Sequence, residues 1–412
     1  MRLLIIGNGG RESALAWKLK DDSRITKMFF AKGTASTAEL GQNVYESEIV
    51  ALRDFAIKEK IDLTIVGPEA PLVEGIVDEF KKHDLKIFGP NKRTASLEGS
   101  KVFSKKFMQT YNIKTAKAVV FDAYNDAIKY VENQTFPIVI KASGLAGGKG
   151  VVICEDLTEA KATIHSFMID RIYGDAGIQL VIEEYLDGFE TSIIAFSNGE
   201  KLFPCIPVKD YKKAGNGDKG PNTGGMGSMA PSPEFTEEHL TDFRKSILEP
   251  TLEGLHAEKL QFKGFIFFGL MVTKTGTYLL EYNMRMGDPE TQALMPLLEN
   301  NLLDLITDCI DGKDVTLNFS NKKSVCLVMC SGGYPRNIET GFQIQGTDKI
   351  QHSQLFYAGA TKRANGVVTT GGRVLNLVAT GDSYQEAREK VYADAKPVHF
   401  DYAFYRDDIG DF

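Results

Sequence analysis

Three polar side chains at alternating positions carry the chemistry that is easiest to recognise in this sequence. Glu281, Asn283 and Arg285 follow the apolar run Thr277–Leu280, and the sequence Gly287–Pro289 ends the segment. The run is rich in β-branched, aromatic and aliphatic residues, so it predicts a strand. Because alternate residues of a strand share a face, the three polar side chains are expected on one side of it.

The chemistry of this face is that of a metal beside a phosphate. A carboxylate (Glu281) and an amide oxygen (Asn283) are hard ligands that suit Mg²⁺. The guanidinium of Arg285 matches phosphate oxygens and keeps its charge. The motif therefore indicates a nucleotide site. Taken alone it is equally compatible with a polar sheet face that is covered by ion pairs.

A glycine-rich hairpin forms the second candidate for phosphate binding. The apolar run Phe136–Lys141 leads into Ser143–Gly150, and Val151–Ile153 is again apolar. Backbone amides in such a loop can close over phosphates. It is not a Walker A loop, since a glycine follows Lys149 and a strand takes the place of the helix. Glycines weaken an ordinary hairpin, so phosphate binding is favoured. The residues expected to contact ATP here are Lys141, Gly144, Gly147, Gly148, Lys149 and Gly150.

A strand, a turn and a second strand over 180–196 have the spacing of an adenine hinge. Backbone groups at Glu184 and Leu186 are placed to read the purine edge, and Glu190 to accept hydrogen bonds from the ribose hydroxyls. Glu183 and Lys105 complete the predicted ATP-binding set. Lys105 belongs to a predicted helix over Ser96–Thr110.

Residues 1–92 alternate between strand and helix, which predicts a parallel, doubly wound sheet. In such sheets ligands bind at the carboxyl ends of the strands. The loops 7–11, 31–36, 67–72 and 89–91 should therefore gather at one edge, and the helix that opens at Gly9 and Gly10 offers free N–H groups to a phosphate.

A dinucleotide-binding domain is the main alternative for this part of the chain. The third glycine of its fingerprint would fall at Glu12, and the acid expected after the second strand is replaced by Ala31 and Lys32. We therefore expect the crevice to bind a sugar phosphate.

The segment Lys209–Pro231 is rich in Gly, Asn and Lys and shows no periodicity. Loops of that length are usually functional or disordered. We expect a substrate loop, with Asp210 and the stretch 222–227 lining the acceptor side.

The order of these features resembles the ATP-grasp ligases. Longer strings resemble one family among them, the phosphoribosylamine–glycine ligases, and the match covers essentially the whole chain. The strings are Gly7–Glu12, Val66–Leu72, Pro221–Gly227 and Gly287–Gln292.

Together, the patterns and the resemblance imply an α/β protein of three domains. These are an N-terminal Rossmann-like substrate domain (1–103), an ATP-grasp domain (104–320) with a lid subdomain at about 120–190, and a C-terminal α+β cap (321–412).

The resemblance also implies a reaction and its residues. ATP, glycine and 5-phosphoribosylamine would give glycinamide ribonucleotide, ADP and phosphate through glycyl phosphate, in de novo purine synthesis. Arg285 and Lys141 would be catalytic, and Glu281 and Asn283 would bind Mg²⁺ or Mn²⁺. We expect a monomer. The implied substrate-binding residues are Gly9, Gly10, Arg11, Gly67, Pro68, Glu69, Asp210, Asn222, Thr223, Gly224, Gly225, Asp288 and Pro289.

Three positions depart from the family pattern. Ser13 stands where the family usually has His. Gly33–Ser36 reads Gly-Thr-Ala-Ser in place of Gly-Asn-Ala-Gly, and Ser143–Gly147 reads Ser-Gly-Leu-Ala-Gly in place of Asp-Gly-Leu-Ala-Ala. The first two lie near the expected phosphoribosyl pocket.

Composition limits the other possibilities. The chain has 412 residues, 43% of them hydrophobic and 25% charged, as in ordinary globular proteins. A net charge of −7 without a basic run argues against a nucleic-acid partner. The five cysteines are scattered, and no stretch reads as a signal peptide or membrane span. We expect a cytoplasmic location and no membrane partner.

Two other functions remain open from the sequence. The chain could be an ATP-grasp ligase with a different carboxylate and amine, or a nucleotide-binding regulator that has lost turnover.

Overall fold

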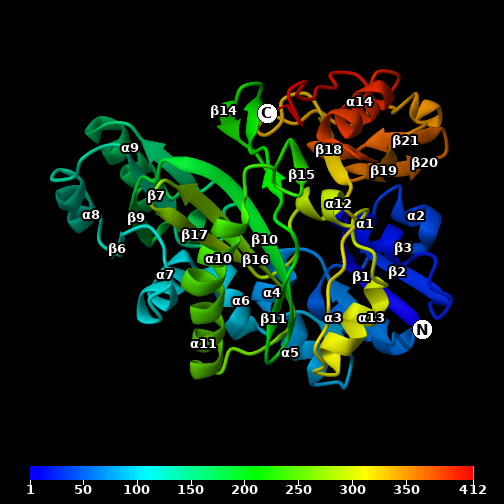
Figure 1. Ribbon diagram of the computed structural model, residues 1–412, viewed down its shortest axis with the longest axis horizontal. Helices are drawn as coiled ribbons and strands as arrows, with labels where there is room; N and C mark the ends of the chain where they lie inside the picture. Colours follow the sequence, from blue (N-terminus) through cyan, green and yellow to red (C-terminus); the bar gives the residue numbers. More distant parts are fainter. Residues whose placement is uncertain (148, 412) are drawn as a thin grey trace.

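The computed structural model describes residues 1–147 and 149–411. The N-terminal domain and the C-terminal residues lie together at one side of the molecule, and the lid lies at the other (Figure 1). The central ATP-grasp sheet connects them. The α/β fold class and its three-part arrangement are as the sequence predicts.

The N-terminal domain is a five-stranded parallel sheet of order β3-β2-β1-β4-β5. In β1, Leu3 and Ile5 pack into one hydrophobic cluster, while Leu4 and Ile6 pack into another on the opposite face. Both faces are buried, which explains the uninterrupted apolar run of this strand. The strands are β1 (Arg2–Gly7), β2 (Lys27–Lys32), β3 (Gln42–Val44), β4 (Leu63–Val66) and β5 (Ile87–Phe88), and the helices are α1 (Gly10–Leu19), α2 (Thr37–Leu40), α3 (Ile49–Lys58), α4 (Glu69–Glu74) and α5 (Ile76–Lys81).

The single helix predicted over Ser96–Thr110 is wrong. The chain forms α6 (Lys92–Gly99) and α7 (Lys101–Thr110), separated at Ser100. Ser100 is extended, with φ −141° and ψ 106°, and its side chain accepts a hydrogen bond from the backbone N–H of Phe103. The serine caps the amino end of α7, and a capping serine has an extended backbone that a continuous helix does not allow.

The lid is an antiparallel sheet of order β6-β9-β7-β8 with two helices. Strands β7 and β8 form the predicted hairpin, in which Lys141 pairs with Val151. The elements are β6 (Ala118–Phe121), α8 (Tyr124–Val131), β7 (Ile138–Ala142), β8 (Val151–Cys154), α9 (Leu157–Met168) and β9 (Leu180–Glu184).

The second ATP-grasp sheet has the order β11-β10-β16-β17. Strand β17 is longer than predicted and includes Glu281 and Asn283, and Arg285 follows its end. Tyr282, Met284 and Met286 are buried, so the predicted alternation of faces is confirmed. The elements are β10 (Gly188–Asn198), β11 (Leu202–Pro204), α10 (Glu237–Phe243), α11 (Glu249–Ala257), β16 (Lys263–Thr273) and β17 (Gly276–Asn283).

The prediction of one long loop over Lys209–Pro231 is wrong in part. It contains four short strands, two of which extend the C-terminal sheet in the order β12-β15-β18-β22-β19. Strands this short have no readable periodicity and depend on the neighbouring strands for their pairing. The four are β12 (Lys209–Asp210), β13 (Lys213–Gly215), β14 (Lys219–Asn222) and β15 (Gly227–Ala230).

The rest of the chain forms the predicted α+β cap and its approach. Two helices lead into it, and one helix packs on its sheet. The elements are α12 (Glu290–Leu294), α13 (Leu302–Ile310), β18 (Lys323–Cys330), β19 (Gln354–Tyr357), β20 (Ala360–Arg363), β21 (Gly366–Thr369), β22 (Arg373–Gly381) and α14 (Tyr384–Ala395).

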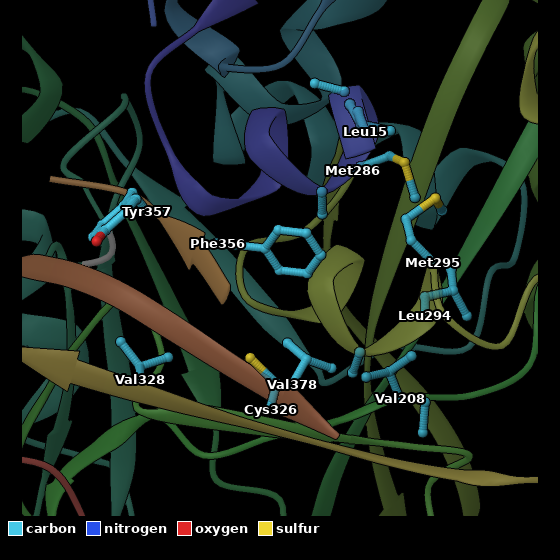
Figure 2. Close-up of a cluster of buried hydrophobic side chains, with 14 of the residues drawn as sticks. Leu15, Val208, Met286, Leu294, Met295, Cys326, Val328, Phe356, Tyr357 and Val378 are labelled. Carbon is cyan, nitrogen blue, oxygen red and sulfur yellow. The ribbon is translucent and has the colours of Figure 1, made fainter. Parts of the chain in front are cut away.

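One hydrophobic cluster joins all three parts (Figure 2). Leu15 of α1 and Leu294 of α12 pack in the same core as Phe356 of β19 and Val378 of β22. The five cysteines are buried and free. In the described part of the chain, no helix is long and apolar enough to cross a membrane.

The first two departures from the family pattern meet at one interface. The Ser13 hydroxyl donates to the backbone carbonyl of Tyr357 at 2.6 Å and lies 2.9 Å from the Thr34 hydroxyl. The Ser36 hydroxyl accepts from the Tyr357 backbone N–H at 2.8 Å. These side chains therefore fasten the N-terminal domain to β19 of the cap.

Replacing Ser13 with Ala tests this fastening. The variant loses a buried hydrogen bond, so we expect the free energy of unfolding to fall by about 1–2 kcal/mol in urea denaturation. Ser96→Ala is the matched control, because Ser96 is an exposed helical serine that also bonds to a carbonyl four residues earlier. It should change stability by less than about 0.5 kcal/mol. Equal effects of the two changes would contradict the interface role.

Candidate active site

A cavity of about 520 Å³ lies where the N-terminal loops, the lid and the second sheet meet. Its walls include Gly9 from the β1–α1 loop, Arg11 from the first turn of α1, Gly147 from the glycine-rich loop, and Glu281 from β17. Arg373 reaches it from the C-terminal cap. The predicted sugar-phosphate crevice and the predicted nucleotide site thus share one space.

Two lysines and one glutamate form a charged cluster between the lid sheet, which carries Lys141 and Glu183, and α7, which carries Lys105. Glu183 lies 2.8 Å from the Nζ of Lys105 and 2.7 Å from the Nζ of Lys141. Burial acts to raise the pKa of Glu183, but Lys141 and Lys105 outweigh it and lower this pKa. Burial lowers the pKa of Lys105, which Glu183 opposes. The register of β7 with β9 places Val139 opposite Glu183, so Lys141 points from the same face.

The face of β17 carries the candidate metal ligands. Burial acts to raise the pKa of Glu281, but the nearby cations, led by Lys212 and Lys101, outweigh it and hold the pKa below its ordinary value. Asn283 lies on the same face, and its Oδ1 is 3.5 Å from Arg285 Nη2. Among residues 1–147 and 149–411, no three His, Cys, Asp or Glu side chains are grouped to hold a metal. An ionised carboxylate and an amide oxygen suit a Mg²⁺ that takes its other ligands from phosphates and water.

Arg285 is held between two carboxylates of the N-terminal part. Its Nη2 lies 3.0 Å from Glu98 Oε1, and its Nε lies 3.4 Å from Glu69 Oε2. The other oxygen of Glu98 accepts the backbone N–H of Met284 at 2.6 Å. Burial raises the pKa of Glu98 to about 7, and Arg285 opposes that rise. The guanidinium is therefore fixed by ion pairs to two separate elements.

Two neighbouring carboxyl groups, those of Asp210 and Glu290, lie on the acceptor side of the cavity. Burial, and then the neighbouring Glu290, raise the pKa of Asp210, and burial also raises the pKa of Glu290. The Oδ1 of Asp210 is buried and finds no hydrogen-bond partner among the described residues. Lys212 beside them is 2.5 Å from Glu190 Oε2, so the predicted ribose acceptor is already in an ion pair.

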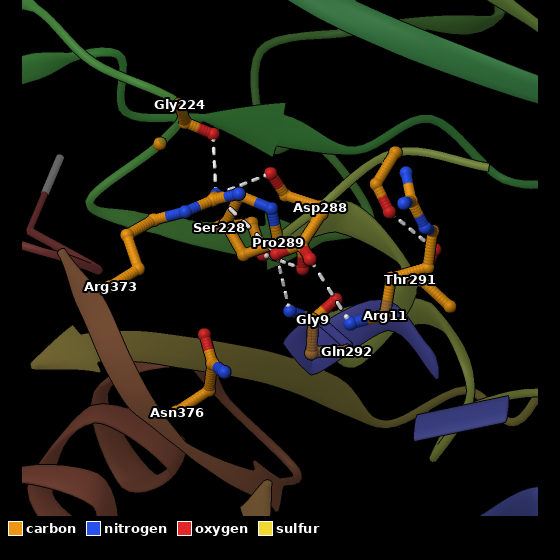
Figure 3. Close-up of polar contacts among 12 residues, drawn as sticks. Gly9, Arg11, Gly224, Ser228, Asp288, Pro289, Thr291, Gln292, Arg373 and Asn376 are labelled. Atoms are coloured by element: carbon orange, nitrogen blue, oxygen red, sulfur yellow. Dashed lines mark hydrogen bonds and ion pairs between the residues drawn. The ribbon is translucent and has the colours of Figure 1, made fainter. Parts of the chain in front are cut away.

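Asp288 connects the acceptor side to the N-terminal domain and to the cap (Figure 3). Its carboxylate accepts from Gln292 Nε2 at 2.7 Å and from the backbone N–H of Arg11 at 3.2 Å. It also pairs with Arg373 Nη1 at 3.4 Å. Burial acts to raise the pKa of Asp288, but Arg373 and Arg11 outweigh it and lower this pKa.

Glu12 organises the N-terminal loops. Its Oε2 accepts from the backbone N–H of Gly9 at 2.6 Å, and its Oε1 lies 2.5 Å from Arg11 Nε. A Cβ on Gly67 would lie 1.8 Å from Glu12 Oε1, so only glycine leaves room there. Glu12 stands where a dinucleotide fingerprint has its third glycine, and this residue therefore shapes one end of the cavity.

The structure brings most of the predicted site residues to the cavity. Those that line it are Gly9, Arg11, Pro68, Glu69, Lys105, Lys141, Gly147, Gly150, Glu183, Glu190, Asp210, Asn222, Thr223, Gly224, Glu281, Asn283, Arg285 and Asp288.

Other predicted residues are not part of its lining. At the hinge, the Glu184 side chain accepts the backbone N–H of Lys117 at 2.8 Å. A Cβ on Gly10 would meet Gln292 and Asn376, so this glycine allows α1 to pack closely. Gly148 lies outside the described residues. The predicted residues absent from the lining are Gly10, Gly67, Gly144, Lys149, Glu184, Leu186, Gly225 and Pro289.

Six charged residues of the cavity were not among the predicted site residues. Glu12 and Glu290 lie in the strings 7–12 and 287–292 that resemble the ligase family, and Lys101 lies in the predicted helix of Lys105. The other three belong to no motif that the sequence shows. The six are Glu12, Glu98, Lys101, Lys212, Glu290 and Arg373.

Comparisons with known proteins agree with this geometry along the chain. The phosphoribosylglycinamide synthetase N domain matches residues 1–98, its ATP-grasp (A) domain matches 99–291, and its C domain matches 324–412. The phosphoribosylamine–glycine ligase of Clostridium acetobutylicum is 48% identical over 415 residues, which is 100% of this chain and 99% of that protein. The ligase of Fusobacterium nucleatum is 46% identical, covering 100% of this chain and 98% of its own.

Solved structures give the same result. The phosphoribosylamine–glycine ligase of Thermotoga maritima aligns with a TM-score of 0.86 and 33% identity, over 99% of this chain and 100% of that one. A biotin carboxylase of Campylobacter jejuni aligns at 0.77 with 13% identity, over 98% of this chain and 92% of that one, which shows a shared fold alone. This chain belongs to the phosphoribosylglycinamide synthetase family.

Proposed function

We propose that this chain is the ATP-dependent ligase that joins glycine to 5-phosphoribosylamine, giving glycinamide ribonucleotide, ADP and phosphate in de novo purine synthesis. The observation that carries the proposal is the shared cavity. Lys105, Lys141 and the face of Glu281 open into the same space as the loops of Gly9 and Glu69. A nucleotide site and a sugar-phosphate site therefore have no wall between them.

The reaction requires activation of a poor acyl donor. Transfer of the γ-phosphoryl group of ATP to the glycine carboxylate gives glycyl phosphate. The amine of the sugar then attacks the carbonyl carbon and expels phosphate. Such chemistry depends on positioning and charge stabilisation rather than on a covalent protein intermediate.

The cations of the cavity supply that stabilisation. Lys105 and Lys141 lie beneath the glycine-rich loop, where they neutralise nucleotide phosphates. Arg285 faces the same space and stays charged, because its pKa lies above its ordinary value. Burial opposes this rise, and Glu98 leads the carboxylates that outweigh burial. A guanidinium held in place by Glu98 and Glu69 is preorganised for the transferring phosphoryl group.

Glu281 and Asn283 would hold Mg²⁺ or Mn²⁺ on the nucleotide phosphates. When bound, such a cation neutralises phosphate charge and fixes the conformation of the triphosphate. The residues' own contribution is an ionised carboxylate and an amide oxygen on one strand face.

Glycine and 5-phosphoribosylamine present groups of opposite charge to the cavity. Glycine carries an ammonium group, and the buried carboxyl groups of Asp210 and Glu290 are suited to receive it. The sugar phosphate is an anion, and the amino end of α1 at Gly9 and Gly10 favours it. Arg11 stands beside that helix end.

The remaining assignments stay predictions. These are the purine contacts of Glu184 and Leu186, and the ribose contact of Glu190, which must now share its carboxylate with Lys212. The domain boundaries at 103 and 320, the monomeric state and the cytoplasmic location also stay predictions.

The proposed function is tested by the co-substrate dependence of phosphate release. With the purified chain and ATP·Mg²⁺, sustained release should require both glycine and 5-phosphoribosylamine. Alanine in place of glycine, and ribose 5-phosphate in place of the amine, are the controls. Turnover with another carboxylate or amine alone would identify a different ATP-grasp ligase, and nucleotide binding without turnover would identify a regulator.

Glu281→Gln tests the metal pair. The amide keeps the shape but lacks the charge that holds Mg²⁺, so turnover should be nearly abolished at limiting Mg²⁺ while the melting temperature stays close to wild type. Glu200→Gln is the control, since Glu200 is exposed on the β10–β11 turn and outside the cavity lining. Near-normal activity of Glu281→Gln across a Mg²⁺ titration would remove Glu281 from the site.

Arg285→Lys separates geometry from charge. Lysine keeps the charge but loses the planar fork, so kcat should fall by about 10²–10³ while KM for ATP changes far less. An arginine that merely bridges Glu69 and Glu98 would instead lower the melting temperature and leave kcat per folded molecule unchanged. Both quantities are measured on the same preparation.

A further inference from the structure

The C-terminal cap holds both sides of one peptide in the acceptor loop. The backbone N–H of Gly224 donates to the Tyr334 hydroxyl at 2.8 Å. The backbone carbonyl of Gly224 accepts from Arg373 Nη1 at 2.5 Å (Figure 3). Tyr334 follows β18 and Arg373 opens β22, so the hydroxyl that accepts and the guanidinium that donates both come from the cap. The loop they grip lines the cavity through Asn222, Thr223 and Gly224.

The same arginine also grips the opposite wall of the acceptor side. Arg373 Nη1 donates to the backbone carbonyl of Asp288 at 2.5 Å and lies 3.4 Å from its carboxylate. That carboxylate accepts the backbone N–H of Arg11 at 3.2 Å. One guanidinium therefore connects Gly224, Asp288 and, through Asp288, the first turn of α1 at the sugar-phosphate end.

The acceptor loop has limited support of its own. Thr223 donates its backbone N–H to the carbonyl of Lys212 at 2.8 Å, and its hydroxyl accepts from the N–H of Gly225 at 3.0 Å. Gly225 has φ +114°, and a Cβ there would lie 2.4 Å from the ring of Pro289. The loop is thus tight and packs against Pro289, in the turn that contains Asp288, and it is held by hydrogen bonds to Arg373 and Tyr334.

We infer that Arg373 and Tyr334 are positioning residues through which the C-terminal cap sets the geometry of the acceptor side. The inference rests on the proposed function, because it assigns the loop 222–225 and Asp288 to the binding of 5-phosphoribosylamine. The cap is then part of the working site, although most of it lies away from the cavity.

Arginine is required for this role by its shape. Its Nη1 donates to both carbonyls and faces the carboxylate, the rigid guanidinium plane fixes the directions of these N–H groups, and the group keeps its charge when buried. A lysine ammonium is a point charge on a flexible stem and cannot hold the two carbonyls in a fixed relation. Tyr334 contributes a single hydroxyl acceptor, which phenylalanine removes with the ring retained.

The test compares Arg373→Lys, Tyr334→Phe and the double variant with Arg388→Lys. Arg388 is the matched control, because it also lies in the cap and donates to one backbone carbonyl, that of Asp407, outside the cavity lining. Steady-state rates are measured with ATP, glycine and 5-phosphoribosylamine varied in turn. Melting temperatures are measured on the same preparations.

We expect Arg373→Lys to lower kcat/KM for 5-phosphoribosylamine by roughly 10²-fold, since displacements of about 1 Å at a reacting centre have effects of that size. KM for ATP should stay within about twofold, because interactions with the nucleotide are unchanged. Tyr334→Phe should act in the same direction and less strongly, and the double variant should show non-additive losses because both residues grip Gly224. Arg388→Lys should match wild type.

Kinetics at wild-type level for Tyr334→Phe and Arg373→Lys would overturn the inference. So would a loss spread equally over all three substrates and matched by a lower melting temperature, which is the pattern of a stabilising contact only. If Arg373→Lys does not fold, Tyr334→Phe alone decides, because it removes one hydroxyl. Absence of turnover in the wild type would instead contradict the proposed function.

Discussion

The site depends on pairing buried side chains of opposite charge, contributed by different elements, around one cavity. Glu183 lies between Lys105 and Lys141 within 2.8 Å of each, and Arg285 lies between Glu98 and Glu69. Burying a lone charge is costly, and breaking a buried pair by removing one partner typically costs about 3–5 kcal/mol. Each of these cations is therefore held by a carboxylate from another element, and under the proposed function the ion pairs that stabilise the fold also orient the residues assigned to catalysis.

The bonding partners of Arg285 and Asp288 come from other domains. The site is therefore complete only when the domains are docked. Arg285 follows a strand of the ATP-grasp sheet, while Glu69 opens helix α4 of the N-terminal domain. Asp288 joins Arg11 of the first domain to Arg373 of the cap. The hydrophobic core is shared in the same way, since Leu15 packs with Phe356 and Val378. Non-directional burial brings the three parts together, and directional ion pairs fix their relative positions.

The parts of this architecture that depend on local periodicity could be predicted. Alternation along β17 placed Glu281 and Asn283 on one face, because a strand repeats every two residues. The glycine-rich hairpin after Lys141 was readable for the same reason. Contacts set by tertiary structure were not readable: Glu98 pairs with Arg285 although 187 positions separate them, and helix propensity does not reveal the break at the nearby Ser100. The sequence likewise gives no reason to single out Arg373 among the cap residues, because its position depends on the pairing of β22 with β18.

The pairing also bears on the divalent cation that the proposed function includes. In the protein alone, Glu183 already offsets much of the charge of Lys105 and Lys141, so these lysines cannot by themselves balance a triphosphate. Arg285 is similarly engaged by Glu98 and Glu69. Under the proposed function, extra positive charge would enter with the nucleotide, and Glu281, whose pKa is lowered, would receive it beside Asn283. The carboxylates that oppose phosphate binding would then favour the metal-bound nucleotide over the free anion.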